Sequence, residues 1–256
     1  MQLAGKVRVG RGGLEVRRLG LGLTLAAALV AFLGSASARA VTVQVCDDGT
    51  CSASLGPLGT TVTNPDGSKT WTLSNPYIVS GSYTVNSWTA TLATDPSVTN
   101  NVNVTNTSSS TQTFSTTVLL SIPAFSYNAI GGSSVGITVT DSNLDGSVTA
   151  SSVTPNGIYT GTINGAGALT LLPDPTSVSC AIVGCSNSAN ANFPGGPAGP
   201  GVATQIAIAL EFTLTPGDSA GLTSVFSIVP EPGTMLLLAS GLVGLAVARR
   251  RTGAIS

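Results

Sequence analysis

One stretch has residue types and a spacing that could bind a metal ion: residues 141–147, which read DSNLDGS. It matches the opening of a calcium loop, D-x-N-x-D-G, in which alternate residues offer oxygens and glycine allows a sharp turn. A complete EF-hand is excluded, because its twelfth position is Ser152 instead of glutamate and no flanking helices are expected. Two interpretations remain: a partial calcium site on Asp141, Asn143 and Asp145, or a hairpin turn, which favours the same residue types.

Groups that could catalyse a reaction are sparse. The chain contains no histidine, which excludes imidazole-based triads and His-ligated metals. Glycoside hydrolysis needs two carboxylates, and Glu211 is the only glutamate between residues 41 and 229. The aspartates of that region lie in turn-like contexts. We therefore expect no enzymatic activity and, calcium apart, no cofactor; a glycoside hydrolase is the enzymatic alternative.

Four aromatic residues gather early in the chain: Trp71, Tyr77, Tyr83 and Trp88. Flat rings can form a platform for sugars, with Asp and Asn neighbours binding the hydroxyls, and this would make the chain a carbohydrate-binding module. Large aromatic side chains also anchor hydrophobic cores, and Trp88 lies in a segment that alternates like a buried strand. Both interpretations stay open from the sequence.

The elements that must position these residues are strands. Residues 202–214 alternate apolar side chains with Ala, Thr, Gln and Glu, which is the period of a half-buried strand. Asn164-Gly165 separates two alternating segments and predicts a hairpin, because a type I′ turn needs positive φ. The pattern predicts an all-β, antiparallel β-sandwich, jelly-roll-like or immunoglobulin-like. Further strands are expected within 82–94, 98–108, 111–122, 135–141, 147–153 and 222–229.

Charge is segregated along the chain. Only 8% of the 256 residues are charged, and nine of the ten bases lie near the two ends. Between residues 41 and 229 there are nine acids and one base, Lys69, which gives that region a net charge of −8. A region with one cation cannot neutralise a run of phosphates, so nucleic-acid binding is excluded.

The N-terminal 40 residues have the order of a secretory signal peptide. Residues 1–18 carry five bases, residues 19–34 are apolar, and Ala38-Arg39-Ala40 is a small-x-small cleavage site before Val41. The sequence therefore predicts a signal peptide over 1–40 and an exported domain over 41–229. The alternative is an uncleaved transmembrane anchor, which the short apolar core disfavours.

The four cysteines form two local pairs in the sequence. Cys46 and Cys51 have four residues between them, and so do Cys180 and Cys185. An even number of cysteines in an exported chain indicates disulfides. We expect Cys46–Cys51 and Cys180–Cys185. Cross-pairing of the early and late cysteines and a four-thiolate zinc site are the disfavoured alternatives.

The C-terminus carries a second membrane signal. Residues 233–248 are uncharged and mostly apolar, and as a helix they would span about 24 Å. A basic cluster follows, which can snorkel and favours a cytoplasmic C-terminus. The prolines before the helix prevent its extension towards the N-terminus, so they lie outside the membrane. The residues of this signal are Pro230, Glu231, Pro232, Arg249, Arg250 and Arg251.

Pro-Glu-Pro, a short apolar helix and a terminal arginine cluster resemble the PEP-CTERM sorting signal over residues 230–256. The resemblance implies processing by a membrane-embedded exosortase after passage through the general export machinery. It also implies transient membrane anchoring through 233–248, then a cell-surface or extracellular-matrix location in a bacterium that makes exopolysaccharide. An ordinary tail anchor that is never cut is the alternative. We thus expect a non-enzymatic exported surface protein, with carbohydrate- or calcium-assisted adhesion as the rival function.

Overall fold

The computed structural model describes part of the chain, and every structural statement below concerns that part. The predicted signal peptide up to residue 38 lies outside it, as do Glu231, Pro232 and the three C-terminal arginines. Of the predicted helix 233–248 only Gly241 is described, and no helix within the described part is long and apolar enough to cross a membrane. The described residues are 39–47, 49–93, 96–122, 128–153, 155–196, 198–199, 202, 204–230 and 241.

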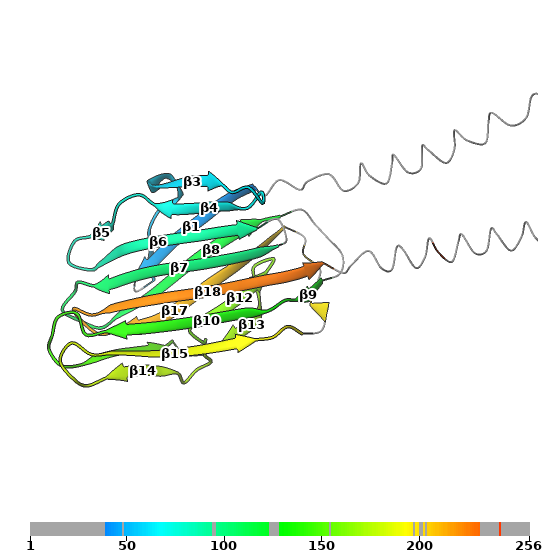
Figure 1. The fold of residues 1–256 in the computed structure, drawn as a ribbon. Coiled ribbons are helices and arrows are strands. Elements are labelled where there is room, and N and C mark those ends of the chain that lie inside the picture. Colours follow the sequence, from blue (N-terminus) through cyan, green and yellow to red (C-terminus); the bar gives the residue numbers. More distant parts are fainter. Residues whose placement is uncertain are drawn as a thin grey trace, which may run out of the picture. The chain divides into compact units, whose positions relative to one another are not determined.

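Two antiparallel sheets make up the described fold, which confirms the predicted all-β sandwich (Figure 1). The first sheet runs β13-β12-β17-β8-β1-β2, with β11 paired to β17 and β14 paired to β11. Its strands are β1 (Arg39–Asp47), β2 (Thr50–Cys51), β8 (Gln112–Ser121), β11 (Val148–Ser152), β12 (Tyr159–Ile163), β13 (Ala166–Leu171), β14 (Ser177–Cys180) and β17 (Gln205–Leu214).

The second sheet runs β15-β10-β18-β7-β6-β4-β3, and three short strands pair off this path: β5 with β6, β9 with β18 and β16 with β9. A single 3-10 turn, η1 (Gly56–Leu58), precedes β3. The strands are β3 (Gly59–Thr63), β4 (Lys69–Leu73), β5 (Tyr77–Val79), β6 (Tyr83–Ala93), β7 (Ser97–Asn106), β9 (Asn128–Ile130), β10 (Ser133–Thr140), β15 (Ser186–Phe193), β16 (Ala198–Gly199) and β18 (Ser219–Pro230).

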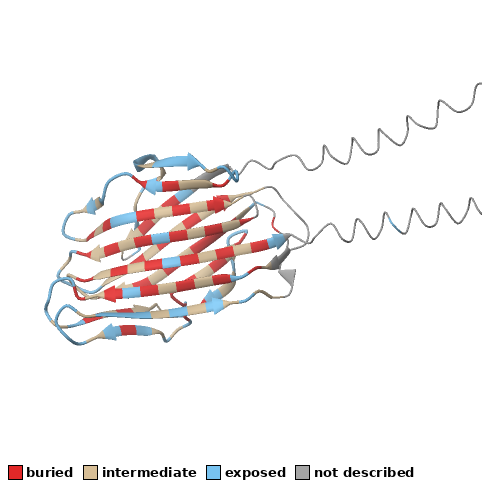
Figure 2. Ribbon diagram, viewed as in Figure 1, coloured by how far each residue is buried: buried red, intermediate tan, exposed pale blue. Residues whose placement is uncertain are grey.

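The core lies between the sheets and follows the two-residue alternation of the sequence (Figure 2). On β17 the apolar positions from Ile206 to Leu214 are buried, as predicted. Phe114 of β8 stacks on Phe212 of β17 with 5.6 Å between ring centroids, and Tyr83 of the second sheet meets Phe114 edge-on at 5.7 Å. These rings join the two sheets through one apolar layer.

The predicted strands are confirmed, and their ends move by a few residues. The segment expected over 202–214 forms β17 from Gln205, and Asn164-Gly165 makes the predicted turn between β12 and β13, with φ of 53° and 82°. Strand β15 was not predicted, because the alternation in SNSANANF is short and rests on two alanines and one phenylalanine, Ala189, Ala191 and Phe193. This strand pairs with β10 at the edge of the second sheet, where its side chains need little burial.

Of the two interpretations of the four aromatic residues, the structure places three residues in the core. Trp71, Tyr83 and Trp88 are 1%, 3% and 0% exposed, so their faces are not available to a ligand. Their polar atoms serve the core instead: Nε1 of Trp88 donates to Oδ1 of buried Asn100 at 2.6 Å. Tyr77 is half-buried on β5 and tilts against Tyr83.

Candidate functional site

Both predicted disulfides are present, and they fasten different parts of the fold. Cys46–Cys51 joins directly opposed residues of β1 and β2 within the first sheet. Cys180–Cys185 links the end of β14 in the first sheet to the residue before β15 in the second sheet. The second bridge therefore closes the crossover between the sheets.

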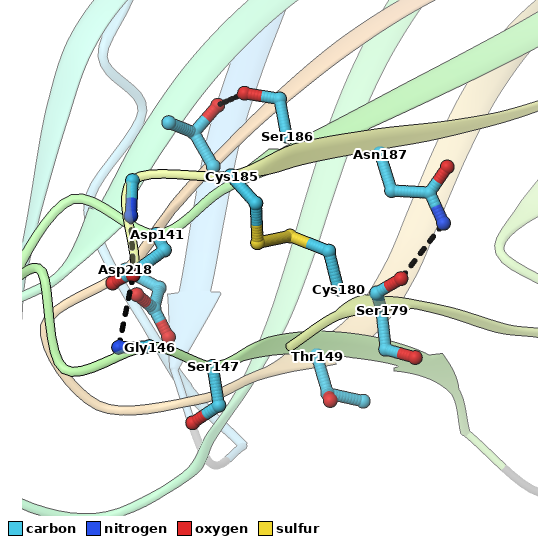
Figure 3. Close-up of a disulfide and its surroundings, with 12 residues drawn as sticks. Asp141, Gly146, Ser147, Thr149, Ser179, Cys180, Cys185, Ser186, Asn187 and Asp218 are labelled. Carbon is cyan, nitrogen blue, oxygen red and sulfur yellow. Dashed lines mark hydrogen bonds between the residues drawn. A yellow bond between two sulfur atoms is a disulfide. The ribbon is translucent and has the colours of Figure 1, made fainter. Parts of the chain in front are cut away.

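The Cys180–Cys185 loop packs on two other turns, and together we call residues 141–147, 180–185 and 215–218 the turn cluster (Figure 3). A hydrogen bond from Asn143 Nδ2 to the carbonyl of Pro216, at 2.9 Å, joins two of the turns. The methyl groups of Val183 and Leu144 lie beside Gly146 and Gly184, respectively. The three connections are thus held against one another at the end of β10 where β18 begins.

Asp141 points into the turn cluster. Its side chain is 1% exposed, and its Oδ2 accepts hydrogen bonds from the N–H groups of Gly146 at 3.0 Å and Gly184 at 2.9 Å. The N–H of Asp141 in turn donates to the carbonyl of Cys185 at 3.0 Å. One carboxylate oxygen therefore ties the predicted calcium loop to the disulfide loop.

The other two predicted calcium ligands face each other at the surface. Asn143 Nδ2 donates to Asp145 Oδ2, and the N–H of Asp145 donates to Asn143 Oδ1, both at 2.9 Å. Hydrogen bonds from Ser147 and Asn143 lower the pKa of Asp145. These are hydrogen bonds of a polar turn, but the hairpin interpretation is wrong, because 141–147 connects β10 of the second sheet to β11 of the first. The described residues contain no group of three or more His, Cys, Asp or Glu arranged to hold a metal ion. Calcium binding by Asp141, Asn143 and Asp145 stays a prediction.

Asp218 is a buried acid of the turn cluster that no sequence motif predicts. It is completely buried at the start of β18, and its Oδ2 accepts a 2.5 Å hydrogen bond from Thr215 Oγ1. Burial raises the pKa of Asp218, Asp145 and Asp141 raise it further, and the hydroxyl of Thr215 and the N–H of Ser142 lower it. In the sequence, Asp218 ends a Pro-Gly-Asp turn directly before a long alternating segment. That pattern predicts a turn but does not indicate which residues the Asp218 side chain contacts.

Glu211 lies on the solvent side of β17, between buried Leu210 and Phe212. Its Oε2 accepts a hydrogen bond from Asn156 Nδ2 at 3.1 Å. A glycosidase would need a second carboxylate across a cleft from this residue. The side-chain hydrogen bond of Glu211 is to the amide of Asn156 and not to a carboxylate.

The C-terminal signal begins inside the last strand. Pro230 ends β18 and pairs with Asn128 of β9, and Val229 pairs with Ala129. Proline is tolerated at such a place because its missing N–H falls at the end of the ladder. The last residue of the described sheet is therefore the first residue of the Pro-Glu-Pro sequence.

The start of the domain lies at the same end of the sandwich. The regular ladder between β1 and β8 begins with Val41 opposite Leu120, after a register shift between Arg39 and Val41. The chain leaves β8 at Ser121 and re-enters the second sheet at Asn128, which pairs with Pro230. Val41 and Pro230 thus mark one end, and the turn cluster marks the other.

Comparison with known proteins identifies the C-terminal signal. Residues 229–251 match the family described as the PEP-CTERM protein-sorting motif. No curated protein matches the chain. A solved structure of TmCBM61 in complex with β-1,4-galactotriose is similar at 12% identity over 74% of this chain and 88% of that chain, with a TM-score of 0.27, which supports no statement about the present chain. The chain therefore carries a PEP-CTERM protein-sorting motif at residues 229–251, the motif of exported proteins that exosortase sorts.

Proposed function

We propose that this chain is a non-enzymatic protein of the cell surface or extracellular matrix that exosortase processes near Pro230 and that associates with exopolysaccharide. The observation that carries the proposal is the junction at Val229–Pro230, where the sorting motif starts within the last strand of the sandwich. A folded domain that ends where the signal begins is released whole when the signal is cut.

The N-terminal half of the proposal rests on the ladder of β1. Regular pairing begins at Val41, the residue that follows the predicted cleavage site. Removal of 1–40 by the export machinery would leave every paired residue from Val41 onwards in the domain. The proposed order is therefore a signal peptide over 1–40, the exported domain over 41–229, and a sorting signal over 230–256 whose apolar segment 233–248 holds the chain in the membrane before processing.

Association with exopolysaccharide is supported by the outer face of the second sheet. On this face, uncharged hydroxyl and amide side chains hydrogen-bond across neighbouring strands, beside exposed apolar residues such as Val62 and Ile78. Such groups can exchange hydrogen bonds with sugar hydroxyls and water at small cost. The cross-strand pairs are Asn86 with Asn103 at 2.6 Å and with Thr105 at 2.8 Å, Thr70 with Thr91 at 3.1 Å, and Thr138 with Ser188 at 2.8 Å.

The sorting half is tested in the native host with the double substitution Glu231→Ala/Pro232→Ala, which leaves the strand residue Pro230 in place. We expect the variant to stay in the membrane fraction with its C-terminal segment attached, whereas the wild-type chain reaches the surface without it. Glu211→Ala is the matched control, since it changes the other glutamate downstream of residue 40 and should be sorted normally. Normal sorting of the double variant would contradict the proposal.

The exopolysaccharide half needs a separate measurement. The processed protein should co-sediment with exopolysaccharide isolated from the same host and stay in the supernatant when that polymer is digested. Normal processing without co-sedimentation would leave exosortase sorting intact and refute the matrix association alone.

A further inference from the structure

Two buried aspartates face each other at the end of a strand pair. The antiparallel ladder of β10 and β18 ends with Thr140 opposite Ser219, so the next residues on the two strands are Asp141 and Asp218. Both side chains are buried, and Figure 3 shows them together beside the Cys180–Cys185 bridge. Like charges directly opposite each other repel, and burial strengthens the repulsion.

Each of these carboxylates has one oxygen held and one oxygen without a partner. Oδ2 of Asp141 is held by two backbone N–H groups, and Oδ2 of Asp218 is held by Thr215. Oδ1 of Asp141 and Oδ1 of Asp218 are both buried without a hydrogen bond. A buried carboxylate oxygen without a partner is costly, and two in one place call for a proton or a cation between them.

Within the described part of residues 41–229, no basic side chain lies close enough to neutralise the pair. Lys69 is the only base between residues 41 and 229, and it lies on β4. In the second sheet β7 and β6 separate β4 from β18, so at about 4.8 Å per strand Lys69 is roughly 14 Å or more from Asp218. The exposed acid Asp145 adds negative charge to the same turn cluster.

We propose that the turn cluster binds a calcium ion through Oδ1 of Asp141 and Oδ1 of Asp218. Neutral oxygens of the adjoining turns and water complete the ligand set, because Ca²⁺ accepts irregular arrangements of about six to eight oxygens. Mg²⁺ binds more weakly here, since it demands a nearly ideal octahedron. With two carboxylates the affinity falls in the range of extracellular modules, a dissociation constant on the order of 10⁻⁴ to 10⁻³ M.

This site differs from the loop that the sequence indicated. Asn143 and Asp145 satisfy each other at the surface, and the second carboxylate comes from Asp218 on another strand. The site also lies far from the sorting motif, because β18 runs from Ser219 to Pro230, a length of roughly 35 Å at about 3.3 Å per residue. Cation binding and sorting can therefore be tested independently.

The test measures thermal unfolding of the full-length chain in detergent, by tryptophan fluorescence, in about 10 mM CaCl2 and in NaCl of matched ionic strength. Matching the ionic strength separates binding from screening of the repulsion. We expect calcium to raise Tm by about 3 to 6 °C, and MgCl2 to raise it less. Calorimetric titration of the wild-type chain with CaCl2 should show one site.

The diagnostic variant is Asp218→Asn, which keeps the shape of the side chain and removes one of the two charges. It should lose the calcium response and show a higher Tm than the wild type without calcium, because the repulsion is relieved. Asp66→Asn is the matched control: Asp66 accepts hydrogen bonds from Ser68 in the turn between β3 and β4, outside the turn cluster.

Three results would overturn the proposal. The first is a wild-type chain that gives neither calorimetric heat nor a calcium-dependent Tm. The second is an Asp218→Asn variant that keeps the full calcium response. The third is a Tm that ignores calcium and rises as the pH falls, which would show that the two carboxylates share a proton. If Asp218→Asn does not fold, the calorimetric titration of the wild-type chain with CaCl2 still tests the proposed calcium site.

Discussion

At the scale of single residues, burial decides which chemistry the side chains can perform. Trp88 illustrates this, because its indole is fully buried and its N–H is bound to Asn100. The sequence did not fix the face on which Trp88 lies, since β6 changes register between Val85 and Ser87. That bulge turns the even-numbered residues after it inwards, whereas Tyr83 and Val85 point inwards before it. A residue-by-residue alternation cannot reveal where such a shift occurs.

The buried tyrosines predict a loss of stability at alkaline pH. Burial, together with Tyr77 and Asp47, raises the pKa of Tyr83 to about 12 from its ordinary value of 10.0. The unfolded chain therefore loses this proton near pH 10 and the folded chain only near pH 12. The neutral Tyr83 therefore contributes fully to the free energy of unfolding below pH 10. This contribution falls, by up to about 2 kcal/mol, as the pH rises from 10 towards 12.

Urea unfolding between pH 8 and 12 measures this effect. Tyr83→Phe should show a shallower fall than the wild type, because one of the ionising groups is gone. Some fall should persist, since burial also raises the pKa of Tyr159. Identical pH profiles for wild type and Tyr83→Phe would contradict the assignment.

At the scale of elements, local patterns predict strands but not their partners. The Asn164-Gly165 turn and the alternation of 202–214 were readable because each depends on adjacent residues. Pairing of β17 with β8 joins segments about ninety residues apart, and the register of such pairs depends on packing that no local pattern encodes. For the same reason, the sequence could not predict that Asp218 lies opposite Asp141, because that position follows from the register of β10 and β18.

The close packing of the two sheets predicts the effect of a single methyl group. A Cβ added at Gly161 of β12 would lie 2.6 Å from the ring of Phe226 on β18. Gly161→Ala should therefore lower the free energy of unfolding by about 1 to 3 kcal/mol. Gly136→Ala on β10 is the control, since no atom lies within 4 Å of the added Cβ, and its effect should stay within about 0.5 kcal/mol. Chemical denaturation compares the two, and equal effects would refute this packing.

The two disulfides close loops of equal length but should differ in their effect on the turn cluster. Replacing either pair by serine should cost about 2 kcal/mol of stability, because each bridge closes a loop of similar chain entropy. Only Cys180→Ser/Cys185→Ser should also weaken the calcium-induced rise in Tm, since Gly184 of that loop holds Asp141. If calcium raised Tm equally in the two double variants, the disulfide loop would play no part in the proposed cation site.

At the scale of the whole molecule, the described sandwich ends where the sorting motif begins, and the signal peptide over 1–40 stays a prediction. The sorting motif was predictable because its three parts are contiguous and each has a distinct composition. A binding site for the proposed exopolysaccharide was not predictable, because recognition by hydroxyl and amide side chains depends on the three-dimensional arrangement of common residues. The described sandwich places Val41 and Pro230 at one end and the turn cluster at the other.

The most direct test of this account is the intact mass of the protein recovered from the surface of its native host. Processing at both ends predicts a chain that begins at Val41 and ends near Pro230, and that gains about 4 Da on reduction, because each disulfide takes up two hydrogens. A mass that retains residues 231–256 would contradict exosortase processing and leave a tail-anchored protein.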